Sequence, residues 1–163
     1  CTSMMRVFYP PLFEDDPELQ RQATELGSRV YELSEFLVKV LGITDVGGKY
    51  AGKVAYHPSC HLLRELEVED EPVQLLRRVD GIDLVGVDEA RTCCGFGGTF
   101  SVKYPHISEG MLEDKLENLK ASGATTLVGC DVSCLMHMEG ALRRRGSTIT
   151  PLHLAQVLES AEE

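Results

Sequence analysis

The stretch Ser108–Cys134 reads SEGMLEDKLENLKASGATTLVGCDVSC and contains one helix followed by one strand, the alternation that decides the fold. Residues 108–121 carry apolar side chains at helical spacing, and Gly123 ends the pattern as a glycine commonly ends a helix. The uninterrupted apolar run at 125–129 predicts a short buried strand, as in parallel sheets. The helical stripe consists of Met111, Leu112, Leu116 and Leu119.

The same alternation continues through the region 53–163. Strand-like runs lie at 54–56, 84–87, 125–129 and 148–150, and helical segments lie at 72–79, 108–121 and 132–145, with a last helix opened by Pro151. Alternating strands and helices favour parallel strands joined by crossovers. The sequence therefore predicts an α/β fold with a mainly parallel sheet and helices on both faces.

The region 1–52 differs from the rest because it contains a long helical segment and a linker. Asp16 is a suitable helix cap, and Pro17 suits the first helical position. Apolar residues recur through 16–41 and predict a buried stripe, which Gly27 divides in two. We expect two units: a helical segment and linker over 1–52, and a cysteine-rich α/β module over 53–163.

Composition excludes several classes of protein. Sixteen basic and 26 acidic side chains give a formal charge of −10, so the surface as a whole repels polyanions and nucleic acid is not an expected partner. Apolar runs fall far short of the roughly 20 residues that span a bilayer. We expect a cytoplasmic protein; peripheral docking on a membrane-bound acceptor stays open.

Five of the six cysteines stand at the places where an α/β sheet binds its ligands. Cys60 follows the first predicted strand, Cys93 and Cys94 follow the second, and Cys130 and Cys134 follow the third. Ligands bind beyond the carboxyl ends of strands in open α/β sheets, so these thiols can converge although they lie far apart in sequence. We expect reduced thiols that hold a metal; scattered buried cysteines are the alternative.

The adjacent pair Cys93-Cys94 precedes a glycine cluster formed by Gly95, Gly97 and Gly98. Adjacent thiols suit a cluster of several irons better than one tetrahedral zinc, because a cluster offers more than one attachment point. The glycines let the backbone approach closely and turn amides toward an anionic group. A phosphate cradle or a plain turn is the alternative for the glycine loop.

These residues together resemble the cysteine-rich CCG-domain family, specifically its lactate-utilisation (LutA/YkgE) branch, which is related to the cysteine-rich subunit of heterodisulfide reductase. The family pattern is a cysteine, a long gap, Cys-Cys-Gly, a second long gap and Cys-x-x-Cys. Here 32 residues separate Cys60 from Cys93, and 36 separate Cys94 from Asp131. The strings HPSCH at 57–61, CCGFGGTFSVK at 93–103 and SCLMH at 133–137 carry the resemblance.

Two departures from the family pattern matter. Asp131 stands where the terminal pair has its first cysteine, and Cys130 lies one position earlier. Either could contribute a ligand beside the four expected ones, Cys60, Cys93, Cys94 and Cys134; a buried strand position is the alternative for Cys130. Cys1 resembles the last cysteine of a preceding module, and we expect it to be an orphan ligand in this chain.

Three histidines lie near the cysteines: His57, His61 and His137. Histidine ligates zinc as well as some iron centres, so a cysteine and histidine zinc site is the alternative cofactor. Hydrogen-bond support for the ligands is the simpler interpretation, and we expect it for these histidines and for the three loop glycines.

The resemblance implies a 4Fe-4S type cluster and an electron-transfer subunit of a complex that oxidises L-lactate, or a related 2-hydroxy acid, with iron-sulfur partner proteins. The chain would then be a non-catalytic or co-catalytic part of an oxidoreductase, since it has no hydride-transfer or acyl-transfer motif. Two alternatives stay open. One is a zinc-stabilised structural module, and the other is thiol/disulfide chemistry at an open cluster, as in heterodisulfide reductase.

Overall fold

The computed structural model describes residues 1–160, so the last three residues of the region 53–163 lie outside the described part. Its centre is a sheet of four parallel strands in the order β2-β1-β3-β4, and the predicted parallel α/β fold is confirmed. The strands are β1 (Lys49–His57), β2 (Asp80–Val85), β3 (Thr126–Gly129) and β4 (Thr150–His153).

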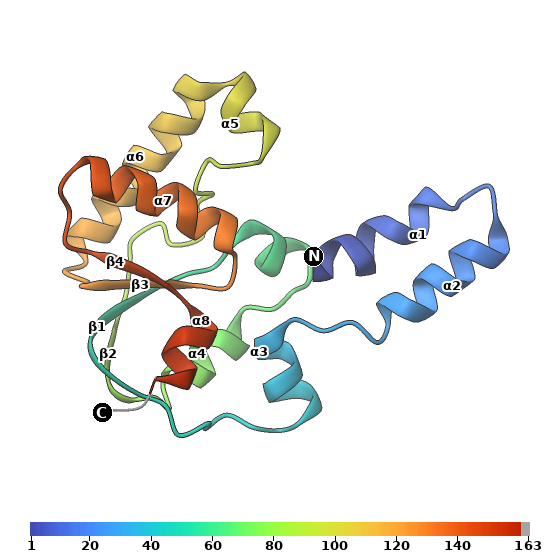
Figure 1. The fold of residues 1–163 in the computed structure, drawn as a ribbon, viewed down its shortest axis with the longest axis horizontal. Helices are drawn as coiled ribbons and strands as arrows, with labels where there is room; N and C mark the ends of the chain where they lie inside the picture. Colours follow the sequence, from blue (N-terminus) through green and yellow to red (C-terminus); the bar gives the residue numbers. More distant parts are fainter. Residues whose placement is uncertain (161–163) are drawn as a thin grey trace.

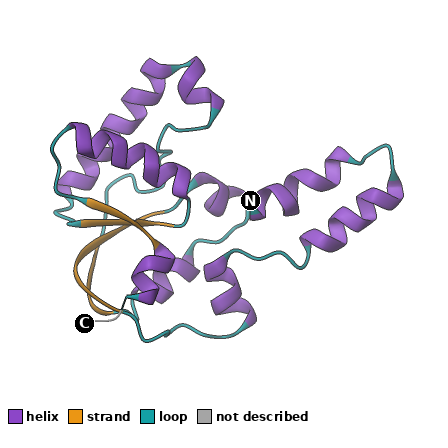
Figure 2. Cartoon of the chain, viewed as in Figure 1, coloured by secondary structure: helices purple, strands orange, loops and turns teal. Residues whose placement is uncertain are grey.

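Helices cover both faces of this sheet (Figures 1 and 2). Successive strand residues point to opposite faces. Ala55 and Leu127 accordingly pack with α6 and α7, whereas Val54 and Val128 pack with α4 and α8. The helices are α4 (Asp70–Leu76), α6 (Pro105–Ala121), α7 (Val132–Arg144) and α8 (Leu154–Glu159).

The end of the chain differs from the prediction. Pro151 lies inside β4, and α8 begins only at Leu154. An edge strand tolerates proline because one side of it needs no ladder hydrogen bond, and β4 pairs with β3 alone. His153 starts α8 instead: its Nδ1 accepts from the Ala155 amide at 3.2 Å, and Gln156 Oε1 accepts from the His153 amide at 2.8 Å.

Of the N-terminal helices, α1 and α2 form an arm that extends away from the sheet, whereas α3 lies beside α4 (Figure 1). Asp16 caps α2 through a 3.1 Å bond from the Leu19 amide, as predicted, and the helical pattern breaks after Gly27. The elements of this region are η1 (Met4–Phe8), α1 (Tyr9–Leu12), α2 (Pro17–Gly27), α3 (Leu33–Glu35) and η2 (Phe36–Val40), the two η elements being π-helical.

The predicted buried stripe of this region is largely exposed. Leu19 and Leu26 of α2 face solvent, and only Ala23 and Gly27 of this helix are buried. The reason is that α2 packs on η1 and α1 instead of on the sheet. The approach is close at Gly27, where a Cβ atom would lie 3.2 Å from the Arg6 Cα.

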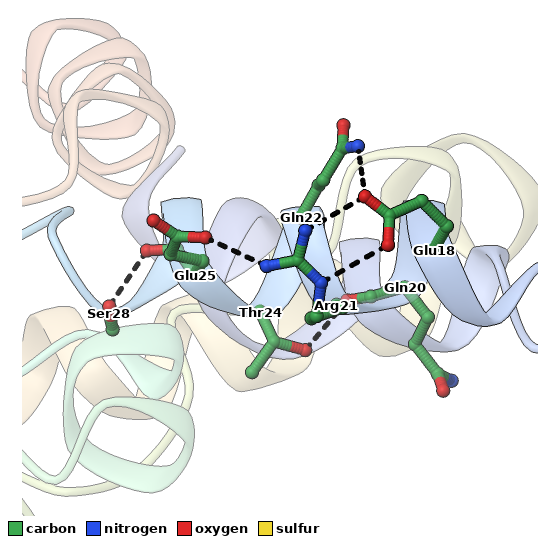
Figure 3. Close-up of polar contacts among 7 residues, drawn as sticks. All are labelled: Glu18, Gln20, Arg21, Gln22, Thr24, Glu25 and Ser28. Carbon is green, nitrogen blue, oxygen red and sulfur yellow. Dashed lines mark hydrogen bonds and ion pairs between the residues drawn. The ribbon is translucent and has the colours of Figure 1, made fainter.

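The outer face of α2 is a local polar network (Figure 3). Arg21 pairs with Glu18 at 2.8 Å and with Glu25 at 3.3 Å. Such exposed pairs contribute little to stability, because water and salt screen them. The remaining members of the network are Gln20, Gln22, Thr24 and Ser28.

The helical segment is attached to the sheet by a half-exposed ion pair. Lys39 Nζ of η2 lies 2.7 Å from Glu71 Oε1 of α4, whose side chain is buried. Within residues 1–160, none of the helices combines the length and the apolar character that crossing a bilayer requires.

Candidate metal centre

Three loops at the carboxyl edge of the sheet bring the cysteines together. Cys60 follows β1 and caps η3 (His61–Glu65), and Cys134 lies in the first turn of α7 after β3. Cys93 and Cys94 lie in the long connection from β2 to α5 (Thr99–Lys103). Because β1 stands between β2 and β3, the connection that carries Cys94 reaches the Cys134 thiol past the end of β1.

The most compact part of the site consists of His57, Cys94 and Cys134. Their ligand atoms all lie within 4.8 Å of one another, and the two sulfurs are 3.1 Å apart. The exposed fractions of these residues are 2%, 1% and 8%. His57 is the last residue of β1, the strand between those that lead to the two cysteines, and this position brings its ring to the two sulfurs.

Both ring nitrogens of His57 are buried, and neither has a hydrogen bond of good geometry among the described residues; the ring interacts instead with the Cys94 thiol. Buried polar groups are nearly always partnered, so an imidazole whose polar neighbour is a thiol of the site calls for an explanation. Burial lowers the pKa of His57, which leaves the ring neutral with a lone pair available. A neutral imidazole is the form that binds metals.

The two buried thiols are in contact through their sulfurs. The hydrogen bond with Cys134, together with the His57 ring and the Phe96 amide, lowers the pKa of Cys94 well below its ordinary value, although burial opposes the charge. The same contact raises the pKa of Cys134. The site is therefore built to hold a thiolate at Cys94, and thiolates are the metal-binding form of cysteine.

Cys60 and Cys93 complete a group of four thiols. Their side chains lie next to each other, and burial followed by the Cys93 thiol raises the pKa of Cys60 to about 11. Both residues are partly exposed, in contrast to Cys94 and Cys134. All six cysteines of the chain are free thiols, and Cys60 lies within electrostatic range of Cys93, Cys94 and Cys134.

The glycine loop directs amides at the sulfurs. The Gly95 amide donates to Cys93 Sγ at 3.4 Å, and the Phe96 amide donates to Cys94. Gly95 has a φ of 84°, and a Cβ atom there would lie 2.6 Å from the Ser108 carbonyl oxygen, so only glycine fits. Gly97 and Gly98 also have positive φ and lead into α5.

His137 supports this loop from α7. Its ring lies 5.5 Å from the Phe96 ring, and its Nε2 is 3.5 Å from Ser108 Oγ. Ser108 in turn donates to the Gly95 carbonyl at 2.7 Å. His137 thus contacts the residues that shape the glycine loop.

Asp131 and Cys130 take different positions. Asp131 Oδ1 caps α7, accepting from the Ser133 amide at 2.9 Å and from the Cys134 amide at 3.3 Å. Burial opposes its charge, but these bonds and that of the Ser133 hydroxyl outweigh burial and lower its pKa. Cys130 packs with the core on the α4 and α8 face, 3.8 Å from the Tyr56 hydroxyl. The structure does not bring Cys130 to the four thiols.

Cys1 and His61 lie beside the site. Residues of the N-terminus, of η3 and of the turn after β3 line a cavity of about 210 Å³. His61 Nδ1 is 2.9 Å from Glu65 Oε2, and Ser3 also bonds to Glu65. The cavity lining includes Cys1, Ser3, His61, Cys130 and Asp131.

Sequence reasoning missed Lys115 altogether. This lysine of α6 is buried, and its ammonium donates to the Ala90 and Thr92 carbonyls at 2.9 and 2.8 Å. A signal was present, since Lys115 lies three residues after Leu112 and four before Leu119, on the apolar stripe of its helix.

Comparison with known proteins gives the family. A family model described as a cysteine-rich domain, CCG, matches residues 54–139. Lactate utilization protein A of Shouchella clausii is 47% identical over 162 residues, and that of Oceanobacillus iheyensis is 43% identical over 163 residues. The matches cover 99% and 100% of this chain and 67% and 66% of the relatives, so the chain spans about two thirds of their length.

The matched region contains all four converging cysteines, His57 and the glycine loop. The similarity to the two relatives extends over the helical arm as well, since it covers nearly the whole chain. The chain therefore belongs to the cysteine-rich CCG-domain family and, within it, to the lactate utilization protein A group.

Proposed function

We propose that this chain holds an iron-sulfur cluster, of the 4Fe-4S type, through Cys60, Cys93, Cys94 and Cys134. The observation that carries the proposal is that three loops bring Cys94 and Cys134 into contact beside the buried His57 ring and place Cys60 next to Cys93, within electrostatic range of Cys94. Iron-sulfur clusters are held by cysteine thiolates, and several irons accommodate the adjacent thiols of Cys93 and Cys94. The donor set therefore fits the group that the family implies.

The residues around the thiols suit a redox centre. Such a cluster supplies one-electron transfer. The Gly95 and Phe96 amides stabilise negative charge on the Cys93 and Cys94 sulfurs. Hydrogen bonds to sulfur and burial are the means by which a protein sets a cluster potential. The buried His57 ring excludes water from the inner side of the thiols.

We infer that the electrons come from oxidation of L-lactate to pyruvate, a reaction that releases two electrons and two protons. The relatives' name, lactate utilization protein A, supports this substrate. The chain would act as an electron-transfer subunit beside iron-sulfur partner proteins. The proposal includes a cytoplasmic location, with docking on a membrane-bound acceptor left open.

A zinc centre is the second candidate. The group of His57, Cys94 and Cys134 contains three ligand atoms of the kinds that zinc takes, and Cys60 could supply a fourth. Direct disulfide chemistry has less support. The Cys94 thiolate is 1% exposed, so a substrate disulfide has no access to it in this conformation.

Metal analysis separates these candidates. The protein, purified without oxygen, is assayed for iron, acid-labile sulfide and zinc, and its visible spectrum is recorded before and after dithionite. We expect iron with a comparable amount of sulfide and an absorbance that dithionite bleaches. Stoichiometric zinc without sulfide would replace the redox function with a structural one.

A further inference from the structure

Lys115 occupies a position where a lysine is rarely found. Its residue is 6% exposed, on the face of α6 that packs on the sheet with Leu112 and Leu119. Within residues 1–160 no carboxylate lies within ion-pair distance of its ammonium. A charge without an opposite partner is strongly disfavoured in a protein interior, so something else must stabilise it.

Part of the stabilisation comes from the chain that enters the cysteine pair. The ammonium donates to the Ala90 carbonyl at 2.9 Å and to the Thr92 carbonyl at 2.8 Å. Thr92 directly precedes Cys93, in a connection without helix or strand between β2 and α5. Lys115 therefore clamps this connection at the point where it reaches the site.

The thiols supply the rest of the stabilisation of the Lys115 ammonium. Lys115 and His57 line the same small internal cavity, between β1 and α6. Burial lowers the pKa of Lys115, and Cys94, Cys60, Cys93 and Cys134 all act against that effect, so each sulfur lies within electrostatic range of the ammonium. Arg64 of η3 is a second cation within electrostatic range of Cys60.

We propose that Lys115 is a positioning residue of the thiol site: it clamps residues 90–92 and supplies the buried positive charge that offsets the gathered thiolates. This inference rests on the proposed metal centre. Metal binding deprotonates the cysteines, so the negative charge of the site is greatest when it is loaded. A fixed cation close to four sulfurs then favours the loaded state, and more strongly at a buried site than in water.

Cobalt(II) provides a test that does not depend on iron, sulfide or activity. Cobalt(II) chloride is titrated anaerobically into the metal-free forms of the wild-type protein and of the Lys115→Met, Lys115→Gln and Lys120→Met variants, and the thiolate-to-cobalt absorption is followed. Lys120 is an exposed lysine of the same helix and serves as the matched control. In parallel, amide hydrogen exchange is measured over residues 90–98 without metal.

We expect Lys115→Met to bind cobalt(II) at least about tenfold more weakly and to exchange faster at residues 90–98. Lys115→Gln, which keeps donors and loses the charge, should also bind more weakly, an effect that a purely structural role would not produce. Cobalt affinity of both variants within twofold of Lys120→Met would overturn the inference. If the wild-type protein did not bind cobalt, the proposed metal centre itself would be contradicted. If hydrogen exchange over residues 90–98 were then also unchanged in Lys115→Met, the proposed clamp on residues 90–92 would be contradicted as well.

Discussion

The sulfurs of Cys94 and Cys134 lie 3.1 Å apart, although the residues are 40 positions apart in the chain. Their strands, β2 and β3, are not neighbours, because β1 lies between them. The contact therefore requires the connection after β2 to cross the end of β1, where His57 stands. This crossing brings the residues of the site together. The role of each residue can be tested by substitution.

Cys94→Ser should abolish metal binding. A serine hydroxyl is a poor replacement for a thiolate, and Cys94 is the sulfur most stabilised in its charged form. We expect loss of bound metal with a small change in the far-ultraviolet circular dichroism. Cys130→Ser is the matched control, because Cys130 lies on the opposite side of the sheet, and it should keep the metal. Metal loss in Cys130→Ser with retention in Asp131→Ala would contradict this ligand assignment.

His57→Leu should separate function from stability. The wild-type ring buries two nitrogens without partners, and such groups destabilise a protein by about 1–3 kcal/mol each. We therefore expect the metal-free variant to be at least as stable as wild type in urea unfolding, while cobalt(II) affinity falls or its spectrum changes. Lower stability with an unchanged cobalt spectrum would show that His57 serves packing alone.

Asp131 is expected to act first as a helix cap. Replacing a capping aspartate by alanine removes about 1 kcal/mol of stability, whereas asparagine keeps an acceptor in the same place. Asp131→Ala should accordingly lower the free energy of unfolding, and Asp131→Asn should leave it nearly unchanged. Because Oδ1 is committed to the Ser133 and Cys134 amides, we also expect Asp131→Asn to keep its metal content. Metal loss in the asparagine variant alone would assign the carboxylate to the metal.

The ion pair between Lys39 and Glu71 should make stability depend on pH. Burial opposes the charge of Glu71, but the Lys39 ammonium together with the Glu71 and Glu69 backbone amides outweighs burial and lowers the pKa below the ordinary value of 4.5. A carboxyl with a lowered folded-state pKa stabilises the protein above that ordinary value, and the contribution is lost as the pH falls through the folded-state pKa. Because Lys39 is half exposed, the contribution is about 1 kcal/mol.

Urea unfolding between pH 7 and pH 3 measures this effect. Wild type should lose stability over the acid end of the range, and Lys39→Met should lose less because its Glu71 has no cation to lower the pKa. Arg21→Met, which removes only exposed contacts on α2, is the control and should follow the wild-type curve. If the stability of wild type and of Lys39→Met fell in parallel as the pH decreased, the Lys39–Glu71 ion pair would not be a source of the pH dependence.

Much of the fold was accessible from local pattern. The helical stripe at 108–121 and the apolar run at 125–129 correspond to α6 and β3 within a few residues. Local pattern failed at Pro151, because the tolerance of an edge strand for proline depends on strand order. It also failed along 16–41, where periodicity predicts burial but says nothing about which surface covers the stripe.

The sequence by itself determined the family, the parallel α/β architecture and the placement of cysteines after the carboxyl ends of the strands, because these depend on periodicity and on spacing along the chain. Only the tertiary structure decided that His57 lies beside the paired sulfurs of Cys94 and Cys134, that Cys130 faces the other side of the sheet, and that Lys115 reaches the loop before Cys93. Those relations depend on strand order and on the direction of each side chain. Both are set by packing between segments that are distant in the chain, and no local pattern encodes them.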